Sequence, residues 1–459
     1  MLGVLATGAG QAEQTAVIDV NEVLALAQKG DSKAQCRLRT YYSEGPDEAR
    51  DLRKARQWFT KAADQRDPEG ERGLGRLYDS LDPDGHDGAQ AARWYALAAE
   101  QGDAPAQYYL GQLYIEGDGV PHDFARGLAL ITGAAEQKFL RAERDLADRY
   151  DDGDGVAVDY AKSFRWYKAA ADQGDAWAQV NVGYAYDQGR GVAVDWKKSF
   201  ASYLKAAEQG YALGQYNVGR AYAYGAGVDM SCTSAEEWYR RAADQGGQRS
   251  MVELGFLARA CSPDRPELMT EWWRKAAEVG NPDGMVNLGI SYREGLGVPE
   301  DQKEAFKWFL KAAQTGDAGG EGSVGHAYAH GRGVAQDYEQ ALKWYRLAAA
   351  QNEPTALLNL GVLYAKGLGV PLDEKEALRL FLAAANQGLG QAQFNCGVYY
   401  RDGHGTPADP LESYFWFSLA ARQNVKEAQA RTNTMEHYLT PAQLAEAQRR
   451  LAQWKAGTK

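Results

Sequence analysis

The sequence has few histidines and cysteines, no long apolar run and no excess of basic residues. It contains 6 His and 4 Cys in 459 residues, and its 51 Lys and Arg are outnumbered by 62 Asp and Glu, which gives a net charge of −11. Nucleic-acid binding requires a basic stripe that neutralises phosphates. No apolar run approaches the roughly 18 residues that cross a bilayer. The composition therefore argues against a nucleic-acid partner and against an integral membrane segment.

No group of residues in the sequence assembles a catalytic or metal site. Ser202 and Lys205 form an S-x-x-K string, but neither an S-D-N nor a K-T-G partner accompanies it. His326 and His330 are four residues apart, whereas a zinc site needs three or four ligands. The G-x-G loops follow predicted helices and lack the third glycine of a phosphate-binding turn. We predict no catalytic residue, no metal and no small-molecule cofactor, and hence a protein that is not an enzyme.

A phrase close to A-x-x-x-L-G-x-x-Y recurs through nearly all of the chain. Eleven copies begin between Ala34 and Ala392; nine of the ten intervals are 36 residues long, and the one from Ser250 to Gly284 is 34. A fixed period of 20 to 50 residues is typical of solenoids. Because stacked repeats share one continuous core, the period predicts a solenoid instead of two or three globular domains.

One repeat, residues 178–211, shows the predicted helix-turn-helix unit. Ala178, Val182 and Tyr186 fall on one face of a first helix. Gly189 then ends that helix, because glycine readily adopts a positive φ. Asp195 stands at the N-cap of a second helix. The predicted fold class is all-α, an α/α solenoid of helix-turn-helix repeats.

The slots that recur within the chain predict its core. The leucine slot of the first helix is followed by glycine in nine of eleven repeats, which suggests close approach by the backbone of a neighbouring helix. A tyrosine follows three residues later, as a large buried side chain with one polar group. The second helix contributes a predicted buried wedge at Trp58, Trp94, Trp166, Trp238, Trp272, Trp308, Trp344 and Trp416.

The full pattern resembles the SLR family, the Sel-one-like repeats related to tetratricopeptide repeats. It reads A-x-x-x-L-G-x-x-Y-x-x-G-x-G-V-x-x-D followed by W-Y-x-K-A-A-x-Q-G, and it covers about residues 32–425. The resemblance implies a right-handed α/α superhelix, and the sequence is most similar to bacterial members of the family. It also implies a non-enzymatic adaptor or scaffold for proteins or extended peptides. Two alternatives remain: a cell-envelope enzyme-like protein (a weak β-lactamase or a peptidoglycan-fragment binder), and a secreted effector or structural spacer.

The two ends of the chain depart from the repeat. Residues 1–31 are predicted to hold a leader, either a signal-peptide remnant or a disordered segment, and an N-terminal capping helix; residues 426–459 are predicted to form C-terminal capping helices. Cys232 and Cys261 fall in predicted helix-to-helix loops of adjacent repeats, where they could form a disulfide. A disulfide or a signal remnant would favour a periplasmic or secreted protein over a cytoplasmic one, but the compartment stays open.

The first helices are predicted to line a concave groove, by analogy with tetratricopeptide superhelices. The residue before the leucine slot is asparagine in five repeats: Asn181, Asn217, Asn287, Asn359 and Asn395. A carboxamide both donates and accepts, so this row could hold an extended peptide backbone; alternatively, these amides bond to neighbouring helices or water. Tyr184, Phe256 and His326 are predicted to add side-chain contacts. In the N-terminal half, Arg37, Arg72, Arg76 and Arg144 would favour acidic segments.

Overall fold

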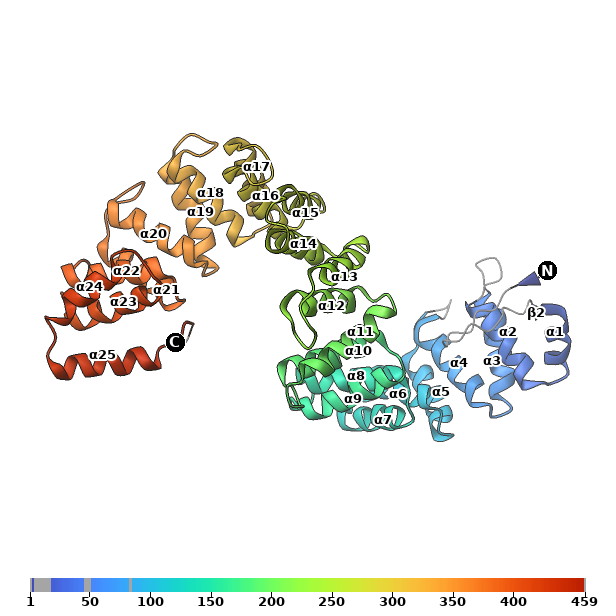
Figure 1. Cartoon of the computed structure of the whole chain (residues 1–459). Coiled ribbons are helices and arrows are strands. Elements are labelled where there is room, and N and C mark those ends of the chain that lie inside the picture. The colour runs from blue at the N-terminus through green and yellow to red at the C-terminus, as the bar shows by residue number, and fades with distance from the viewer. Residues whose placement is uncertain (1, 4–17, 45–50, 82–84, 458–459) are drawn as a thin grey trace. The chain divides into compact units, whose positions relative to one another are not determined.

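The computed structural model describes residues 2–3, 18–44, 51–81 and 85–457, and consecutive helices make up almost all of this part of the chain (Figure 1). Most of the predicted leader lies outside the described residues. The strands β1 (Leu2–Gly3) and β2 (Ile18–Asp19) pair antiparallel, and α1 (Val20–Gln28) follows. None of the described helices is long and apolar enough to cross a bilayer.

In the described part of the chain, eleven helix pairs follow α1. The first helices are α2 (Ser32–Glu44), α4 (Pro68–Arg76), α6 (Ala104–Glu116), α8 (Leu140–Asp152), α10 (Ala176–Gln188), α12 (Ala212–Tyr224), α14 (Gln248–Cys261), α16 (Pro282–Glu294), α18 (Ala318–His330), α20 (Pro354–Lys366) and α22 (Gly390–Asp402). The second helices are α3 (Leu52–Ala63), α5 (Gly88–Glu100), α7 (Phe124–Glu136), α9 (Tyr160–Asp172), α11 (Trp196–Glu208), α13 (Cys232–Asp244), α15 (Pro266–Glu278), α17 (Gln302–Gln314), α19 (Tyr338–Ala350), α21 (Glu374–Asn386) and α23 (Pro410–Arg422). A five-residue π-helix, η1 (Leu77–Leu81), extends α4.

The helix ends are where the repeat predicts them. Gly189 ends α10 in the left-handed conformation, with φ 71°. Asp195 caps α11, and its side chain accepts a hydrogen bond from the backbone N–H of Lys198. The same two devices recur in most of the repeats, and they confirm the helix-turn-helix unit and the predicted all-α solenoid class.

The chain divides into two compact units. Unit 1 comprises Met1–Ala221 and Gly225–Asp229, and unit 2 comprises Tyr222–Tyr224 and Met230–Lys459. The boundary falls at the end of α12, where the sequence repeat continues without interruption. In unit 1, one buried cluster gathers around Ile131 and Leu146. In unit 2, a larger cluster extends to Leu451 of the last helix.

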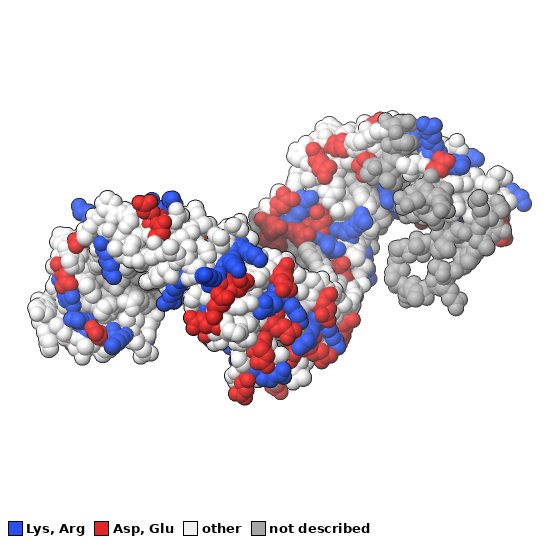
Figure 2. Space-filling view, turned by 90° about the horizontal axis from the view of Figure 1, so that it is seen from above, with Lys and Arg blue, Asp and Glu red and all other residues white. Residues whose placement is uncertain are grey.

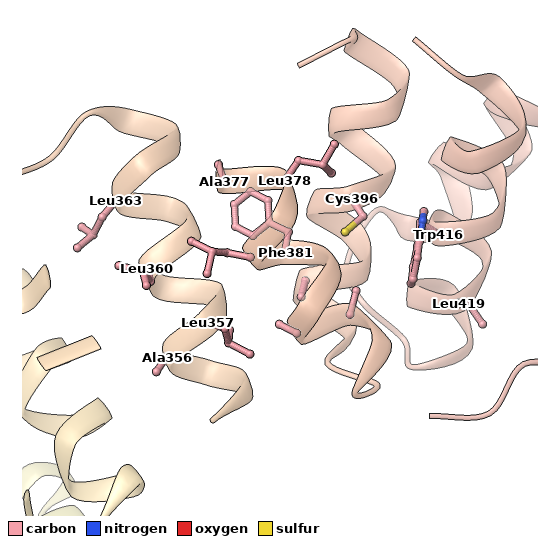
Figure 3. Packing of buried hydrophobic residues seen from close by; sticks show 14 of the residues in the cluster. Ala356, Leu357, Leu360, Leu363, Ala377, Leu378, Phe381, Cys396, Trp416 and Leu419 are labelled. Atoms are coloured by element: carbon pink, nitrogen blue, oxygen red, sulfur yellow. The ribbon is translucent and has the colours of Figure 1, made fainter. Parts of the chain in front are cut away.

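The most deeply buried aromatic ring of a repeat lies one residue after the tryptophan slot. Tyr95, Tyr239 and Phe417 are 0% exposed, whereas the tryptophans at Trp94 and Trp238 are only half-buried. The predicted wedge is displaced by one residue at Trp94 and Trp238. Trp58, Trp166, Trp272 and Trp416 are buried as predicted, at 5% to 8% exposed. Figure 3 shows this buried ring in unit 2, where Phe381 lies beside Leu360 and near the helix of Cys396.

The glycine after the leucine slot accommodates this ring. A Cβ placed on Gly183 would lie 2.6 Å from the ring of Tyr203, which comes from the second helix of the same repeat. The recurrence of this glycine predicted close approach by the backbone of a neighbouring helix. The structure corrects this for Gly183, because the close contact is with a side chain.

The C-terminal segment continues the helical stack after the last repeat. Helix α24 (Ala428–Glu436) packs on α23, and α25 (Pro441–Gln453) also contacts α23. Thr440 and Gln443 form a capping box at the start of α25. Leu451 of α25 is 6% exposed and belongs to the core of unit 2.

Candidate peptide-binding surface

The five predicted groove asparagines occupy the same position in five of the first helices: α10, α12, α16, α20 and α22. Asn217 is 9% exposed and the other four are half-buried. Asn181 Nδ2 donates to the carbonyl of Trp177 on its own helix at 3.2 Å, and Asn395 Oδ1 accepts from Gln391 on its own helix at 3.4 Å. The side chains of Asn217, Asn287 and Asn359 make no hydrogen bond with any described residue. Within the described chain, none of the five bonds to a neighbouring helix.

Two of these asparagines line a groove in unit 2. It lies between α20 and α22, has a volume of about 410 Å³, and includes Asn359 and Asn395 among its lining residues. Val362 and Val398, each three residues after an asparagine, provide apolar surface, and Phe381 of α21 also lines the groove. The groove therefore combines two carboxamides with apolar surface, which fits an extended segment that carries aliphatic side chains.

Phe256 lines a different pocket, in the part of unit 2 that contains the disulfide. Cys232, the first residue of α13, is bonded to Cys261, the last residue of α14, so both cysteines lie at helix ends and not in loops as the sequence predicted. Both also line the pocket of Phe256, whose volume is about 280 Å³. Phe256 is 41% exposed. The structure thus does not bring Phe256 together with Asn359 and Asn395.

Tyr184 and His326 lie on the first helices α10 and α18. Tyr184 is 41% exposed, and the Arg190 guanidinium lies 5.2 Å from its ring centroid. His326 is half-buried, and burial lowers its pKa to about 4, so its ring is neutral at pH 7. The ring of His330 lies 4.4 Å away.

The four arginines differ in their surroundings. Arg72 forms an ion pair with Asp103, the N-cap residue of α6. The Arg144 guanidinium lies 3.4 Å from Asp175, the N-cap residue of α10, and also covers the ring of Trp177. Both carboxylates cap the following first helix, which gives these two arginines a structural role between repeats. Arg37 and Arg76 are exposed.

One cluster of possible metal ligands was not singled out from the sequence. Asp79, His86 and Asp118 have ligand atoms within 4.8 Å of one another. His86 Nε2 lies 2.8 Å from Asp118 Oδ2, and its Nδ1 contacts the carbonyl of Asp79. These contacts raise the pKa of His86 and account for the cluster as an ion pair between adjacent repeats. Elsewhere, the Ser202 hydroxyl donates to the carbonyl of Lys198 on its own helix.

A second row of Gln and Glu side chains, not predicted from the sequence, links the two helices inside a repeat. Gln209 Nε2 donates to Gln179 Oε1 at 2.8 Å, and Gln179 Nε2 donates to the carbonyl of Ala171 in the preceding repeat at 3.4 Å. Equivalent pairs over thirty residues are Gln65 with Gln35, Gln101 with Glu71, Gln137 with Gln107, Gln173 with Glu143, Gln351 with Glu321 and Gln423 with Gln393. The signal was present in the sequence: a Gln or Glu directly follows the residue that opens each of these repeat phrases, and a Gln directly precedes the positive-φ residue after the second helix.

The helix pairs, their caps and their shared core define an α/α solenoid repeat protein. The Sel1 repeat pattern matches residues 32–67, 68–103, 104–139, 140–175, 178–211, 212–247, 270–281, 282–317, 323–353, 354–389 and 390–425. The chain therefore belongs to the Sel1 repeat family. The match is shortest in the seventh repeat, the one that the sequence shows to be two residues short.

Two solved structures are similar to the chain. One is a protective antigen present in uropathogenic Escherichia coli strains that displays an SLR fold; it is 33% identical, with 95% of this chain and 94% of that chain covered and a TM-score of 0.68. The other is a Sel1 repeat protein from Oxalobacter formigenes, 26% identical over 75% of this chain and 90% of that chain, with a TM-score of 0.45. No match was found among the curated proteins. Sel1 repeats generally serve as protein-interaction scaffolds.

Proposed function

We propose that the protein is a non-enzymatic adaptor that binds extended segments of partner proteins along the asparagine-bearing faces of its first helices. The observation that carries this proposal is that three of the asparagine side chains lack hydrogen-bond partners in the described part of the chain. Asn217, Asn287 and Asn359 make no side-chain hydrogen bond with the described residues, although a carboxamide can both donate and accept. A peptide backbone offers the matching N–H and C=O groups.

The groove between α20 and α22 is the part of this surface on which the proposal can be tested most directly. Its apolar lining, which includes Val362 and Val398, would hold aliphatic side chains while Asn359 and Asn395 bond to the main chain. The disulfide between Cys232 and Cys261 favours action in an oxidising compartment, such as the periplasm or the exterior. The similarity to a protective antigen of E. coli is compatible with that location.

The test uses an immobilised library of N-acetylated, C-amidated peptides and the full chain. Asn359→Ala combined with Asn395→Ala should weaken binding by about tenfold or more, since each lost hydrogen bond is worth about 1 kcal/mol. Asn433→Ala is the matched control, because Asn433 is an exposed asparagine on α24, outside the groove. Unchanged binding by a folded double variant would reject the asparagine row as the binding site.

A further inference from the structure

The groove between α20 and α22 has a charged residue at its edge. Lys366, the last residue of α20, lines the groove and is exposed. Among the described residues that line the groove it alone carries a charge; the others are apolar or amide side chains, apart from Tyr399. The groove therefore presents a positive charge and no negative one to whatever lies in it.

The Lys366 ammonium makes no ion pair or hydrogen bond with the described residues. Some exposed lysines of the chain are paired, whereas others, such as Lys375, also have no partner among the described residues. Lys198 pairs with Asp195, and Lys307 pairs with Glu304. A lysine at the end of a helix also interacts favourably with the helix dipole, so a stability measurement would not separate a binding role from a local one. A binding measurement separates the two roles.

The amide groups of Asn359, Gln391 and Asn395 line the same groove as this lysine. Asn359 makes no side-chain hydrogen bond with the described residues, and Asn395 makes one long bond to Gln391. All three amide side chains, together with Lys366, line the same groove as Val362 and Val398. Its surface thus offers donors and acceptors for a main chain, apolar area for an aliphatic side chain, and one cation.

We propose that the segment bound in this groove carries an aliphatic side chain and, close to it, the carboxylate of an aspartate or glutamate that pairs with Lys366. This inference rests on the proposed function and specifies the partner. An internal acidic side chain is the source to which we commit, because the asparagine row continues on α16 of the same unit and indicates a segment that extends beyond the groove. An exposed ion pair is weak, so acidic peptides should be preferred only about threefold over their amide counterparts.

The experiment measures residue preference in the N-acetylated, C-amidated peptide library at low ionic strength. Wild type should prefer an aliphatic residue near Asp or Glu. Lys366→Gln should abolish the acidic preference while retaining binding to neutral peptides, and Lys366→Glu should convert it to a preference for Lys or Arg. Lys375→Gln is the control, because Lys375 is an exposed lysine of α21 that does not line the groove. The acidic preference should also weaken as salt is added.

The possible failures are distinguishable. If Asn359→Ala with Asn395→Ala weakens binding but Lys366→Gln leaves the residue preference unchanged, the acidic partner is refuted and the groove stands. If neither set of substitutions changes binding, the proposed function fails as well. A gain in affinity that requires a free C-terminal carboxylate, seen with non-amidated peptides only, would refute the internal acidic side chain.

Discussion

Replacing Glu143 by glutamine is expected to stabilise unit 1 at neutral pH. The Glu143 side chain lies in α8, is 2% exposed, and accepts a hydrogen bond from Gln173 Nε2 at 2.6 Å. Burial is the largest cause that raises the pKa of this carboxyl above its usual value, because the ionised form loses its hydration. The folded state therefore holds the charge at a cost in free energy.

The next repeat shows what glutamine does in the same slot. Gln179 accepts the equivalent hydrogen bond from Gln209, and its own amide donates to the carbonyl of Ala171. In Glu143→Gln the acceptor for Gln173 is kept, and a donor is added toward the matching carbonyl, that of Ala135. One added neutral hydrogen bond is worth about 1 kcal/mol. For a solenoid of this size that gain corresponds to about 2 °C in the unfolding midpoint.

The pH dependence gives the prediction its sign. A carboxyl whose pKa is raised on folding stabilises the fold fully below its unfolded pKa, and this contribution is lost as the pH rises through the folded pKa. Glutamine does not titrate. The gain of Glu143→Gln over wild type should therefore be present at about pH 7.5 and should shrink or reverse toward about pH 4. Thermal unfolding followed by far-UV circular dichroism at the two pH values measures it.

The reverse substitution is the matched control. Gln179→Glu removes the donor to Ala171 and buries a carboxyl in a position that is 5% exposed. It should lower the free energy of unfolding by about 1–3 kcal/mol at neutral pH, and by less in acid. The reasoning is wrong if Glu143→Gln destabilises the protein at neutral pH, or if its gain is the same at both pH values.

Two further substitutions test the packing and the disulfide. Gly183→Ala places a Cβ 2.6 Å from the ring of Tyr203 and should cost about 1–3 kcal/mol by overpacking; a urea titration with an unchanged midpoint would contradict this. Cys232→Ser with Cys261→Ser opens a link between residues 29 apart. The chain-entropy relation then predicts a loss of about 3–4 kcal/mol. Reductant should lower the unfolding midpoint of wild type but not that of the double variant. A wild-type midpoint that reductant leaves unchanged would contradict the predicted contribution of the disulfide.

The sequence specifies the helix pairs because their signals are local. A glycine that must take positive φ, as Gly189 does, and an aspartate that caps the next helix, as Asp195 does, act within a few residues and recur at each period. The period then establishes which helices pair, and the Sel1 repeat match agrees with that assignment. Fold class could accordingly be predicted without coordinates.

The features that the sequence did not reveal depend on distances between repeats or between helices. The ring that fills the space over Gly183 belongs to Tyr203, next to the tryptophan slot, and both slots are aromatic in several repeats. The bond from Gln209 to Gln179 spans thirty residues. The ion pair of Arg72 with Asp103 spans 31 residues. The sequence predicted that Arg72 would bind an acidic partner segment and did not reveal that an aspartate of the same chain already pairs with it. Such pairings become visible only when the helices are packed against one another.

The two rows of polar side chains differ in whether their polar groups have hydrogen-bond partners within the chain. Gln179 and Asn181 are two residues apart on α10, but Gln179 is 5% exposed and bonded on both its oxygen and its nitrogen. In the buried row each pair is joined by a hydrogen bond, as burial favours; Glu71 Oε1 makes no hydrogen bond, but Arg66 Nε lies 3.6 Å from it. In the asparagine row, Asn287 and Asn359 are half-buried and make no side-chain hydrogen bond with the described residues. A repeat protein whose amides served only its own packing would be expected to satisfy both rows, and the difference between them is the reason to expect a ligand on the second.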